Sequence, residues 1–278
     1  MIILSIAGWL PDIWPKAIVP LTVRNASGGF LPIGTAFLVD HLYDEQHFNC
    51  LVTAKHVIMK SDGQPRTDLF LLANKKGQGI DWLELSSLSS SGITWKTHPE
   101  RDVAAIAVPI IIQTHDVMKF MPEIFEDFSS IREGDDIFFL GFPLQIGVTA
   151  NRITPIARSG MVALRNEDET FLIDANVFPG NSGSPVFFKP CAFETRGREI
   201  KLGPIRQPKL LGLITSYIPY EEVAVSPQTG LPRVIFQENS GLANVLPMRF
   251  VREVLGSPDF AQMLQRLLDR RQQAPPAS

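Results

Sequence analysis

Cysteine is scarce in this sequence, with only Cys50 and Cys191 among 278 residues. These two can form one disulfide at most, far below the density that small secreted scaffolds need, so we expect two reduced thiols. Long apolar runs are lacking as well: the apolar segment 1–10 is about half of the ~20 residues that a membrane helix needs, and no basic residue precedes it. We therefore expect a buried N-terminal segment, no membrane contact and a cytoplasmic location, while a secreted or periplasmic location stays open.

A surplus of charge of one sign is also lacking. The chain has 26 Lys and Arg against 29 Asp and Glu, a formal net charge of −3, and no dense basic stripe. Nucleic-acid binders carry such a stripe, so we expect no nucleic-acid partner. Hydrophobic residues make up 45% of the chain, which is enough to build a large core and excludes wholesale disorder.

Short apolar stretches separated by polar turns fill most of the chain. They have the length of β-strands and a spacing typical of an antiparallel barrel or sandwich. In the first half they lie at 17–23, 34–39, 49–53, 69–73 and 102–108, and in the second half at 136–141, 161–164, 171–174, 184–188, 210–215 and 242–246. Residues 110–134 are less regular and are typical of a connection. The sequence therefore predicts two β-units of similar size.

A helical period occurs only near the C-terminus. Ser257 can cap a helix and Pro258 suits its first position. Apolar residues then follow at helical spacing, namely Phe260, Met263, Leu264, Leu267 and Leu268. Such a stripe is more often core packing than a binding surface, so we expect this helix to dock on the body of the protein.

The most specific string runs from Pro179 to Pro185, with Ser182 at its centre and a glycine on either side. By composition it could be a tight turn, because Gly, Asn and Ser are common turn residues. A nucleophilic serine also needs this pattern: small neighbours let a carbonyl carbon approach, and successive backbone N–H groups must point to the place where negative charge develops. Gly180 and Ser182 are the expected donors of such an oxyanion hole.

A serine nucleophile requires a base and an orienting carboxylate. All five histidines precede Ser182 in the chain, which excludes the order of the α/β-hydrolases. His56 stands at the end of an apolar strand, where the chain turns. Asp102 opens the apolar run 102–108, which draws its carboxylate partly out of water. A strand-end histidine and a strand-capping aspartate paired with Arg101 are the plain alternatives for these two residues.

These motifs together resemble the signature blocks of the trypsin-like (chymotrypsin-fold) serine peptidases. The blocks are Thr53–Val57, Arg101–Ala107 and Gly180–Pro185, in the order His, Asp, Ser. The segments 34–39, 134–143 and 211–215 are similar to parts of the bacterial HtrA-type and glutamyl-endopeptidase-type branches. The resemblance covers about residues 17–250. It implies an all-β fold of two antiparallel six-stranded β-barrels with a catalytic cleft between them, followed here by a C-terminal helix.

The resemblance also implies the division of the chain and the residue roles. We expect an N-terminal barrel at 1–120, a connecting segment at 121–134, a C-terminal barrel at 135–250, and a C-terminal helix and tail at 251–278. His56 matches the general base, Asp102 its orienter and Ser182 the nucleophile. Thr215 matches a residue whose hydroxyl supports the aspartate, and Thr215, Ser216 and Tyr217 match the strand that pairs with substrate.

The specificity pocket is the least determined part of the expected site. Asn176 matches the pocket floor and carries no charge, so a preference for Arg or Lys before the scissile bond is not supported. Ile214 stands where glutamate-specific relatives have a histidine, and a small or apolar side chain is therefore expected. Two additional loops, at about 190–208 and 219–240, are expected to border the cleft and to narrow or gate it.

The expected activity is that of a serine endopeptidase acting on protein or peptide substrates, without cofactor or metal. The alternative is a catalytically silent or partner-activated binding module on the same fold, because a fold does not guarantee activity. A regulatory partner is left open. A zinc site made from His41, His47, Cys50 and His56 has irregular spacing and would consume the expected base.

Overall fold

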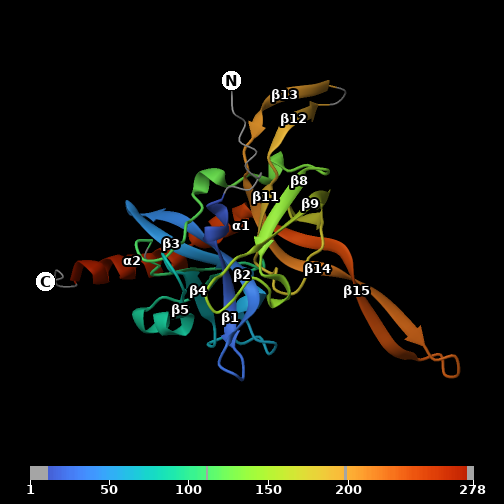
Figure 1. Cartoon of the computed structure of the whole chain (residues 1–278), viewed down its shortest axis with the longest axis horizontal. Coiled ribbons are helices and arrows are strands. Elements are labelled where there is room, and N and C mark those ends of the chain that lie inside the picture. Colours follow the sequence, from blue (N-terminus) through green and yellow to red (C-terminus); the bar gives the residue numbers. More distant parts are fainter. Residues whose placement is uncertain (1–11, 111, 197–198, 274–278) are drawn as a thin grey trace.

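The structure is a computed structural model, and it describes residues 12–110, 112–196 and 199–273. The segment 1–10, expected to be buried, and residues 274–278 of the expected tail lie outside the described residues. Figure 1 shows two β-rich halves, with both C-terminal helices beside the N-terminal half. None of the helices within the described residues is long and apolar enough to cross a membrane.

The N-terminal half is one antiparallel sheet with the strand order β5-β4-β1-β2-β3-β7-β6. Its strands are β1 (Ile18–Arg24), β2 (Phe30–Tyr43), β3 (Gln46–Thr53), β4 (Phe70–Asn74), β5 (Ile80–Glu84), β6 (Lys96–Thr97) and β7 (Ala104–Ala107). The expected barrel is only partly seen in this half: the sheet has seven strands rather than six, and its end strands β5 and β6 do not pair in the part of the chain that is described. The end strand β6 has only two residues, too few to close a ladder with β5.

The C-terminal half is a closed barrel of six strands, as expected, in the order β10-β15-β14-β11-β8-β9. Its strands are β8 (Asp136–Gly141), β9 (Ile156–Arg165), β10 (Phe171–Asp174), β11 (Pro185–Phe188), β14 (Leu210–Val225) and β15 (Pro232–Pro247). Fully buried side chains such as Phe139, Phe171 and Val186 fill its interior. The sheet strands lie within 18–107 and the barrel strands within 136–247. The domain boundaries themselves stay a prediction.

Aromatic side chains join the two halves in one core. Trp14 lies in the short helix η1 (Trp14–Ala17), and its ring centroid is 5.3 Å from that of Phe120 and 4.7 Å from that of Phe187. The Phe187 ring in turn stacks on Phe138 of β8 at 5.0 Å. Because these rings come from both halves and the connection between them, burying them fixes how the sheet and the barrel meet. The other 3₁₀ helices are η2 (Lys55–Ile58), η3 (Leu85–Ser91), η4 (Pro122–Ile124), η5 (Phe128–Ser130) and η6 (Pro143–Gln145).

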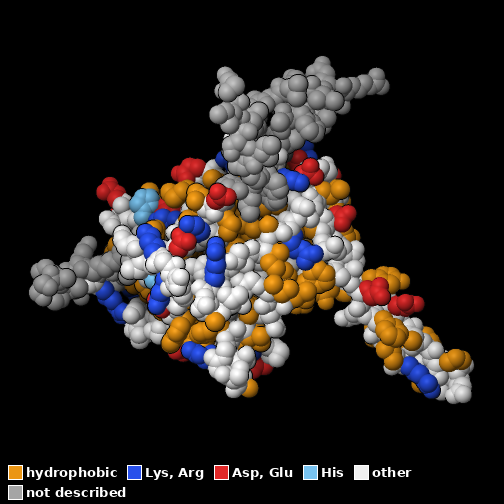
Figure 2. Space-filling view, in the orientation of Figure 1, with side chains coloured by type: hydrophobic (Ala, Val, Ile, Leu, Met, Phe, Trp, Pro, Cys, Tyr) orange, Lys and Arg blue, Asp and Glu red, His pale blue; other side chains and the backbone are white. Residues whose placement is uncertain are grey.

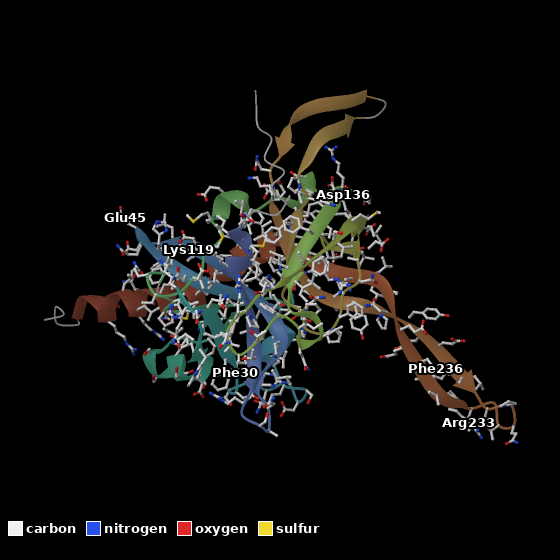
Figure 3. The ribbon with its side chains drawn as sticks, viewed as in Figure 1. Phe30, Glu45, Lys119, Asp136, Arg233 and Phe236 are labelled. Atoms are coloured by element: carbon white, nitrogen blue, oxygen red, sulfur yellow. The ribbon has the colours of Figure 1, made fainter. Side chains whose placement is uncertain are left out.

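Two hairpins stand where the sequence suggested loops. Strands β12 (Cys191–Arg196) and β13 (Glu199–Arg206) pair as a separate two-stranded sheet. Beyond the barrel, β14 and β15 continue as a paired ribbon, residues 218–240, which we call the arm. Figure 1 shows the arm projecting away from the body, and Figure 2 shows apolar side chains along it. Among these, Phe236 is 54% exposed and is labelled with Arg233 in Figure 3.

The C-terminus forms two helices where the sequence indicated one. These are α1 (Met248–Leu255) and α2 (Pro258–Gln273), separated by Gly256 and Ser257. The Ser257 hydroxyl oxygen accepts the backbone N–H of Phe260 at 3.3 Å, so the predicted cap is present. Four residues of the predicted apolar stripe are buried and Leu267 is partly buried, and Phe260 packs edge-on against His41 of the first sheet at 5.7 Å. The C-terminal segment therefore packs back on the N-terminal half.

Candidate active site

His56 lies just after strand β3, in the short helix η2. The neighbouring Val57 is buried and anchors this turn in the core. Gly34 of β2 makes room for it, because a Cβ at Gly34 would lie 2.5 Å from the Val57 side chain. The His56 side chain itself is 49% exposed, so the imidazole stands at the surface on a rigid base.

Asp102 lies in the loop that leads from β6 into β7, and both of its carboxylate oxygens face His56. Oδ1 accepts the backbone N–H of His56 at 2.9 Å, and Oδ2 accepts the N–H of the Nδ1 nitrogen at 2.7 Å. The carboxylate is 36% exposed, consistent with the expectation that it is drawn partly out of water. Because the carboxylate accepts at Nδ1, that nitrogen carries the imidazole proton and Nε2 is left as an acceptor.

Ser182 completes a continuous chain of hydrogen bonds. Its hydroxyl lies 2.9 Å from Nε2 of His56, which is free to accept the hydroxyl proton. Asp102, His56 and Ser182 come from three segments that are 46 and 126 residues apart along the chain, counted from His56. The structure therefore brings together the three residues that the sequence motifs singled out.

The turn around Ser182 depends on two glycines. Gly180 and Gly183 have φ of +99° and +85°, in the left-handed region that other residues adopt at a cost. A Cβ at Gly180 would lie 2.2 Å from the Phe142 carbonyl oxygen, and one at Gly183 would lie 2.1 Å from the Thr35 carbonyl oxygen. Any larger residue would thus push the turn away from the strands that support it.

Thr35 of β2 holds this turn from the other half of the molecule. Its backbone N–H donates to the Ser182 carbonyl oxygen at 2.8 Å, and its hydroxyl donates to the Gly180 carbonyl oxygen at 2.7 Å. With those carbonyls fixed toward β2, the backbone N–H groups of Gly180 and Ser182 are not used within the turn. Neither N–H has an acceptor in the described part of the chain. Two free donors beside a serine hydroxyl can stabilise a developing negative charge.

The segment 215–217 lies where β14 passes the end of β11. The pairing of β11 with β14 begins at Pro185 opposite Leu213, so residues beyond Ile214 extend past that partner. Ser216 and Tyr217 are exposed there, and Ser216 accepts the side-chain N–H of Asn244 at 3.0 Å. The strand edge at 215–217 is thus placed to pair with an extended chain.

Thr215 requires a correction to the role that the resemblance implied. Its hydroxyl does not support Asp102 but donates to the Asn244 carbonyl oxygen at 3.3 Å. The physical reason is a register shift between Ile214 and Ser216 in the β14–β15 pairing, which leaves Thr215 as an extra residue. The Thr215 side chain therefore bonds to the paired strand β15 instead of Asp102.

Asn176 lines an open pocket of about 320 Å³ together with Ala157, Arg158 and Ser159. It lies six residues before Ser182 and is exposed. Its assignment as the floor of the specificity pocket stays a prediction. Arg158 was not foreseen from the sequence. Within β9 it is one of two charged residues, the other being Arg165, and no local pattern distinguishes it from a surface arginine.

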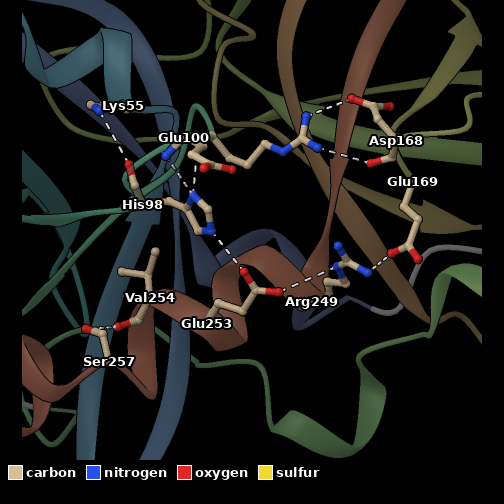
Figure 4. Close-up of polar contacts among 10 residues, drawn as sticks. Lys55, His98, Glu100, Asp168, Glu169, Arg249, Glu253, Val254 and Ser257 are labelled. Atoms are coloured by element: carbon tan, nitrogen blue, oxygen red, sulfur yellow. Dashed lines mark hydrogen bonds and ion pairs between the residues drawn. The ribbon is translucent and has the colours of Figure 1, made fainter.

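A polar network fixes the loop that carries Asp102 (Figure 4). Backbone N–H groups of Glu100 and Arg101 donate to Nδ1 of His98 at 3.1 and 3.0 Å, and Nε2 of His98 lies 2.9 Å from Glu253 of α1. Because Nδ1 accepts, Nε2 carries the proton and donates to Glu253. Helix α1 therefore helps to position the catalytic loop, through residues that carry no recognisable motif.

The same loop is tied to the barrel by Arg101. Its guanidinium donates to the Asp168 carboxylate at 2.7 Å and to the Asp168 carbonyl oxygen at 3.2 Å. Hydrogen bonds from Thr170 and Arg101 lower the pKa of Asp168 to about 2. Arg101 thus pairs with Asp168 rather than with Asp102, which leaves the Asp102 carboxylate to His56.

The four residues considered as zinc ligands do not come together in one site. His47 bonds Asp40 at 2.6 Å, and His56 bonds Asp102 and Ser182. Burial raises the pKa of the Cys50 thiol, which disfavours the thiolate that a metal needs. Across residues 12–110, 112–196 and 199–273, no three His, Cys, Asp or Glu side chains form a group that could hold a metal ion.

Comparisons with known proteins give one family and a set of solved structures. The chain is similar to the serine endoprotease from Yersinia pestis, with 14% identity and a TM-score of 0.48 over 91% of this chain and 64% of that one. It is also similar to a variant of the HtrA-type protease AlgW solved with a decapeptide, with 15% identity and a TM-score of 0.47 over 93% of this chain and 65% of that one. The chain thus spans just under two thirds of the length of these proteins. No curated protein matches it.

The family model of the trypsin-like peptidase domain matches residues 34–189. This segment is more than half of the chain and contains most of β2, the His56 turn, the Asp102 loop and the Ser182 turn. The match and the seven- and six-stranded halves described above agree with each other. On this evidence the chain belongs to the trypsin-like peptidase family.

Proposed function

We propose that this protein is a serine endopeptidase that hydrolyses peptide bonds through an acyl-enzyme. The observation that carries the proposal is the hydrogen-bonded chain from Asp102 through His56 to Ser182, at 2.7 and 2.9 Å. In it Ser182 is the nucleophile, His56 the general base and Asp102 the residue that orients the imidazole. The substrate is a protein or peptide, and no step needs a cofactor.

The first half of the reaction forms the acyl-enzyme. The Ser182 oxygen attacks the peptide carbonyl carbon while its proton passes to Nε2 of His56, and the charge that develops on the carbonyl oxygen is held by the N–H groups of Gly180 and Ser182. The carbon–nitrogen bond then breaks, and His56 gives its proton to the leaving amine. Asp102 stabilises the positive imidazole between these two steps.

The second half releases the product. A water molecule takes the place of the amine, loses a proton to His56 and attacks the ester carbon. The ester bond breaks, the Ser182 oxygen recovers the proton, and a free carboxylate leaves. The substrate backbone pairs with residues 215–217, whose exposed edge supports this placement.

A fluorophosphonate probe tests the proposal directly, since it labels only an activated serine. We expect the folded protein to be labelled at Ser182 and to cleave peptides, and the variant Ser182→Ala to lose both properties while keeping its fold. Ser184→Ala is the matched control, because Ser184 lies in the same turn but its hydroxyl is fully buried. No labelling and no cleavage under conditions that label a control protease would instead support a binding module with a protease fold.

A further inference from the structure

The pocket that Asn176 lines holds a charged residue to which neither the reaction nor the sequence motifs give a role. Arg158 and Ser159 of β9 line it with Asn176, in a space of about 320 Å³ that opens to solvent. Asn176, which the resemblance places at the floor of the pocket for the side chain before a scissile bond, is one of its lining residues. The backbone segment 177–181, which connects Asn176 to Ser182, is held in place by hydrogen bonds. The side-chain N–H of Asn239 donates to the carbonyl oxygen of Val177, the residue after Asn176, at 2.5 Å.

The turn between the pocket and the nucleophile is also fixed. The N–H of Asn181 donates to the Phe178 carbonyl oxygen at 3.0 Å, and the N–H of Leu144 donates to the Pro179 carbonyl oxygen at 2.8 Å. The ring of Phe178 lies 5.0 Å from the Arg158 guanidinium carbon. A cation–π contact of this kind holds the long arginine side chain at the pocket wall without neutralising it.

Six arginines in the described part of the chain lie over aromatic rings, and Arg158 differs from three of them. Arg101, Arg249 and Arg252 also stand over aromatic rings, but each of them binds a carboxylate as well. Within the described residues, Arg24 and Arg165 lie over rings without a carboxylate as well, and Arg24 donates to the Gly28 carbonyl oxygen. Arg158 has no carboxylate and no hydrogen-bond acceptor in the part of the chain that the structure describes. The half-buried guanidinium is a cation with five N–H donors, so an anion is the group that the pocket lacks.

The remaining polar groups of the pocket favour the same ligand. Asn176 and Ser159 also have no partner in the described ranges, and both can donate to a carboxylate. A guanidinium binds a carboxylate with two parallel hydrogen bonds, whereas a Lys or Arg side chain would be repelled and an apolar one would leave the charge uncompensated.

We infer that the proposed peptidase cleaves after acidic residues, with Arg158 as the residue that sets this preference. The inference rests on the proposed function and names its substrate class. It replaces the expectation of a small or apolar side chain, which considered Asn176 and Ile214 alone. The positive charge of the pocket comes from Arg158 of β9, and none of the sequence motifs lies in this strand.

A set of peptides that differ only in the residue before the cleaved bond tests the inference. With Glu, Asp, Gln, Leu and Lys at that position, we expect kcat/KM for Glu or Asp to exceed that for Gln by about 10- to 100-fold, as a charge-assisted hydrogen bond gives. Arg158→Gln should abolish this ratio, and Arg158→Lys should keep part of it. Arg152→Gln, an exposed arginine outside the pocket, should leave the ratio unchanged.

A second variant covers the case in which Arg158→Gln does not fold. Asn176 is exposed, and Asn176→Asp places a carboxylate beside Arg158 without disturbing the core. It should lower the ratio of Glu to Gln cleavage by competing for the guanidinium.

The outcomes separate the inference from the proposed function. Equal cleavage after Glu and Gln, or a Glu preference that persists in both Arg158→Gln and Asn176→Asp, overturns the inference, while labelling at Ser182 leaves the peptidase activity standing. If no peptide is cleaved and Ser182 is not labelled, both are wrong.

Discussion

The imidazole of His56 illustrates how single atoms decide the chemistry of this site. The Asp102 carboxylate accepts two hydrogen bonds from His56, one from its backbone N–H and one from Nδ1 of the ring. The ring is thereby held in one orientation. That orientation leaves Nε2 facing the Ser182 hydroxyl. The tautomer is therefore set by a carboxylate that never touches the substrate, and a change of one atom in that group should be visible in the rate.

Asp102→Asn is the substitution that tests this dependence. The asparagine amide can donate to Nδ1, which moves the ring proton to Nε2 and leaves no acceptor for the serine proton. We expect kcat to fall on the order of 10³- to 10⁴-fold, with little change in the melting temperature. Steady-state hydrolysis and thermal unfolding measure the two effects.

Asp116→Asn is the control for Asp102→Asn, because Asp116 also binds a cation, Lys16, at 2.7 Å, but lies outside the site. It should leave kcat unchanged. An Asp102→Asn protein with full activity would show that the orienting role is wrong.

Elements that carry no catalytic residue position those that do. Helix α1 reaches the Asp102 loop through Glu253 and His98, and the β9–β10 turn reaches it through Asp168 and Arg101. The carboxylates of both contacts are about half exposed, so each contact stabilises the fold only slightly. Their effect is on the position of a loop rather than on the presence of the fold.

The Asp168 contact should show a defined dependence on pH. Its pKa is lowered from 3.8 to about 2 in the folded protein, so the folded state favours the charged carboxylate. The stabilisation is therefore complete above the ordinary value and is lost as the pH falls through about 2. Asp168→Asn should lower the free energy of unfolding at neutral pH by at most about 1 kcal/mol, and this difference should disappear near the lower pH.

Urea unfolding of both proteins across this pH range measures the difference. Glu167→Gln is the control, since Glu167 is an exposed neighbour of Asp168. A difference between the wild type and Asp168→Asn that grows as the pH falls would contradict the assigned contacts.

At the scale of the whole molecule, the arm stands apart from the body. Two of its large apolar side chains, those of Tyr220 and Phe236, are more than half exposed and belong to neither core cluster. The arm is held as a ribbon by strand pairing and by its turn, in which the N–H of Ser226 donates to the Leu231 carbonyl oxygen at 2.9 Å. Folding of the body should not depend on it.

Replacing residues 221–237 by Asn-Gly tests this independence, because a two-residue turn can close the ribbon at Tyr220 and Glu238. We expect the free energy of unfolding to change by less than about 1 kcal/mol and small peptides still to be cleaved. Leu213→Ala, in the buried part of β14, is the comparison and should cost about 2–5 kcal/mol. Loss of cooperative unfolding in the shortened protein would show that the arm belongs to the core.

The triad motifs could be recognised in the sequence because their requirements are local. A nucleophilic turn needs Gly180 and Gly183 beside Ser182, and those two glycines are visible without any structure. Most strands were likewise indicated by their apolar runs. The sequence pattern predicts a loop for the arm because the apolar residues there serve no core face. It does not indicate α1 as a separate helix, because its eight residues show little more than two turns of period.

The sequence by itself determined the fold class, the strands of the barrel and the identity of three candidate catalytic residues, since short motifs and apolar runs are encoded by neighbours in the chain. Only the tertiary structure decided that Thr35 holds the Ser182 turn, that Thr215 bonds Asn244 rather than Asp102, and that Arg158 faces a pocket without a carboxylate. These contacts join residues far apart in the chain, and they depend on strand register, which a shift of one residue reverses.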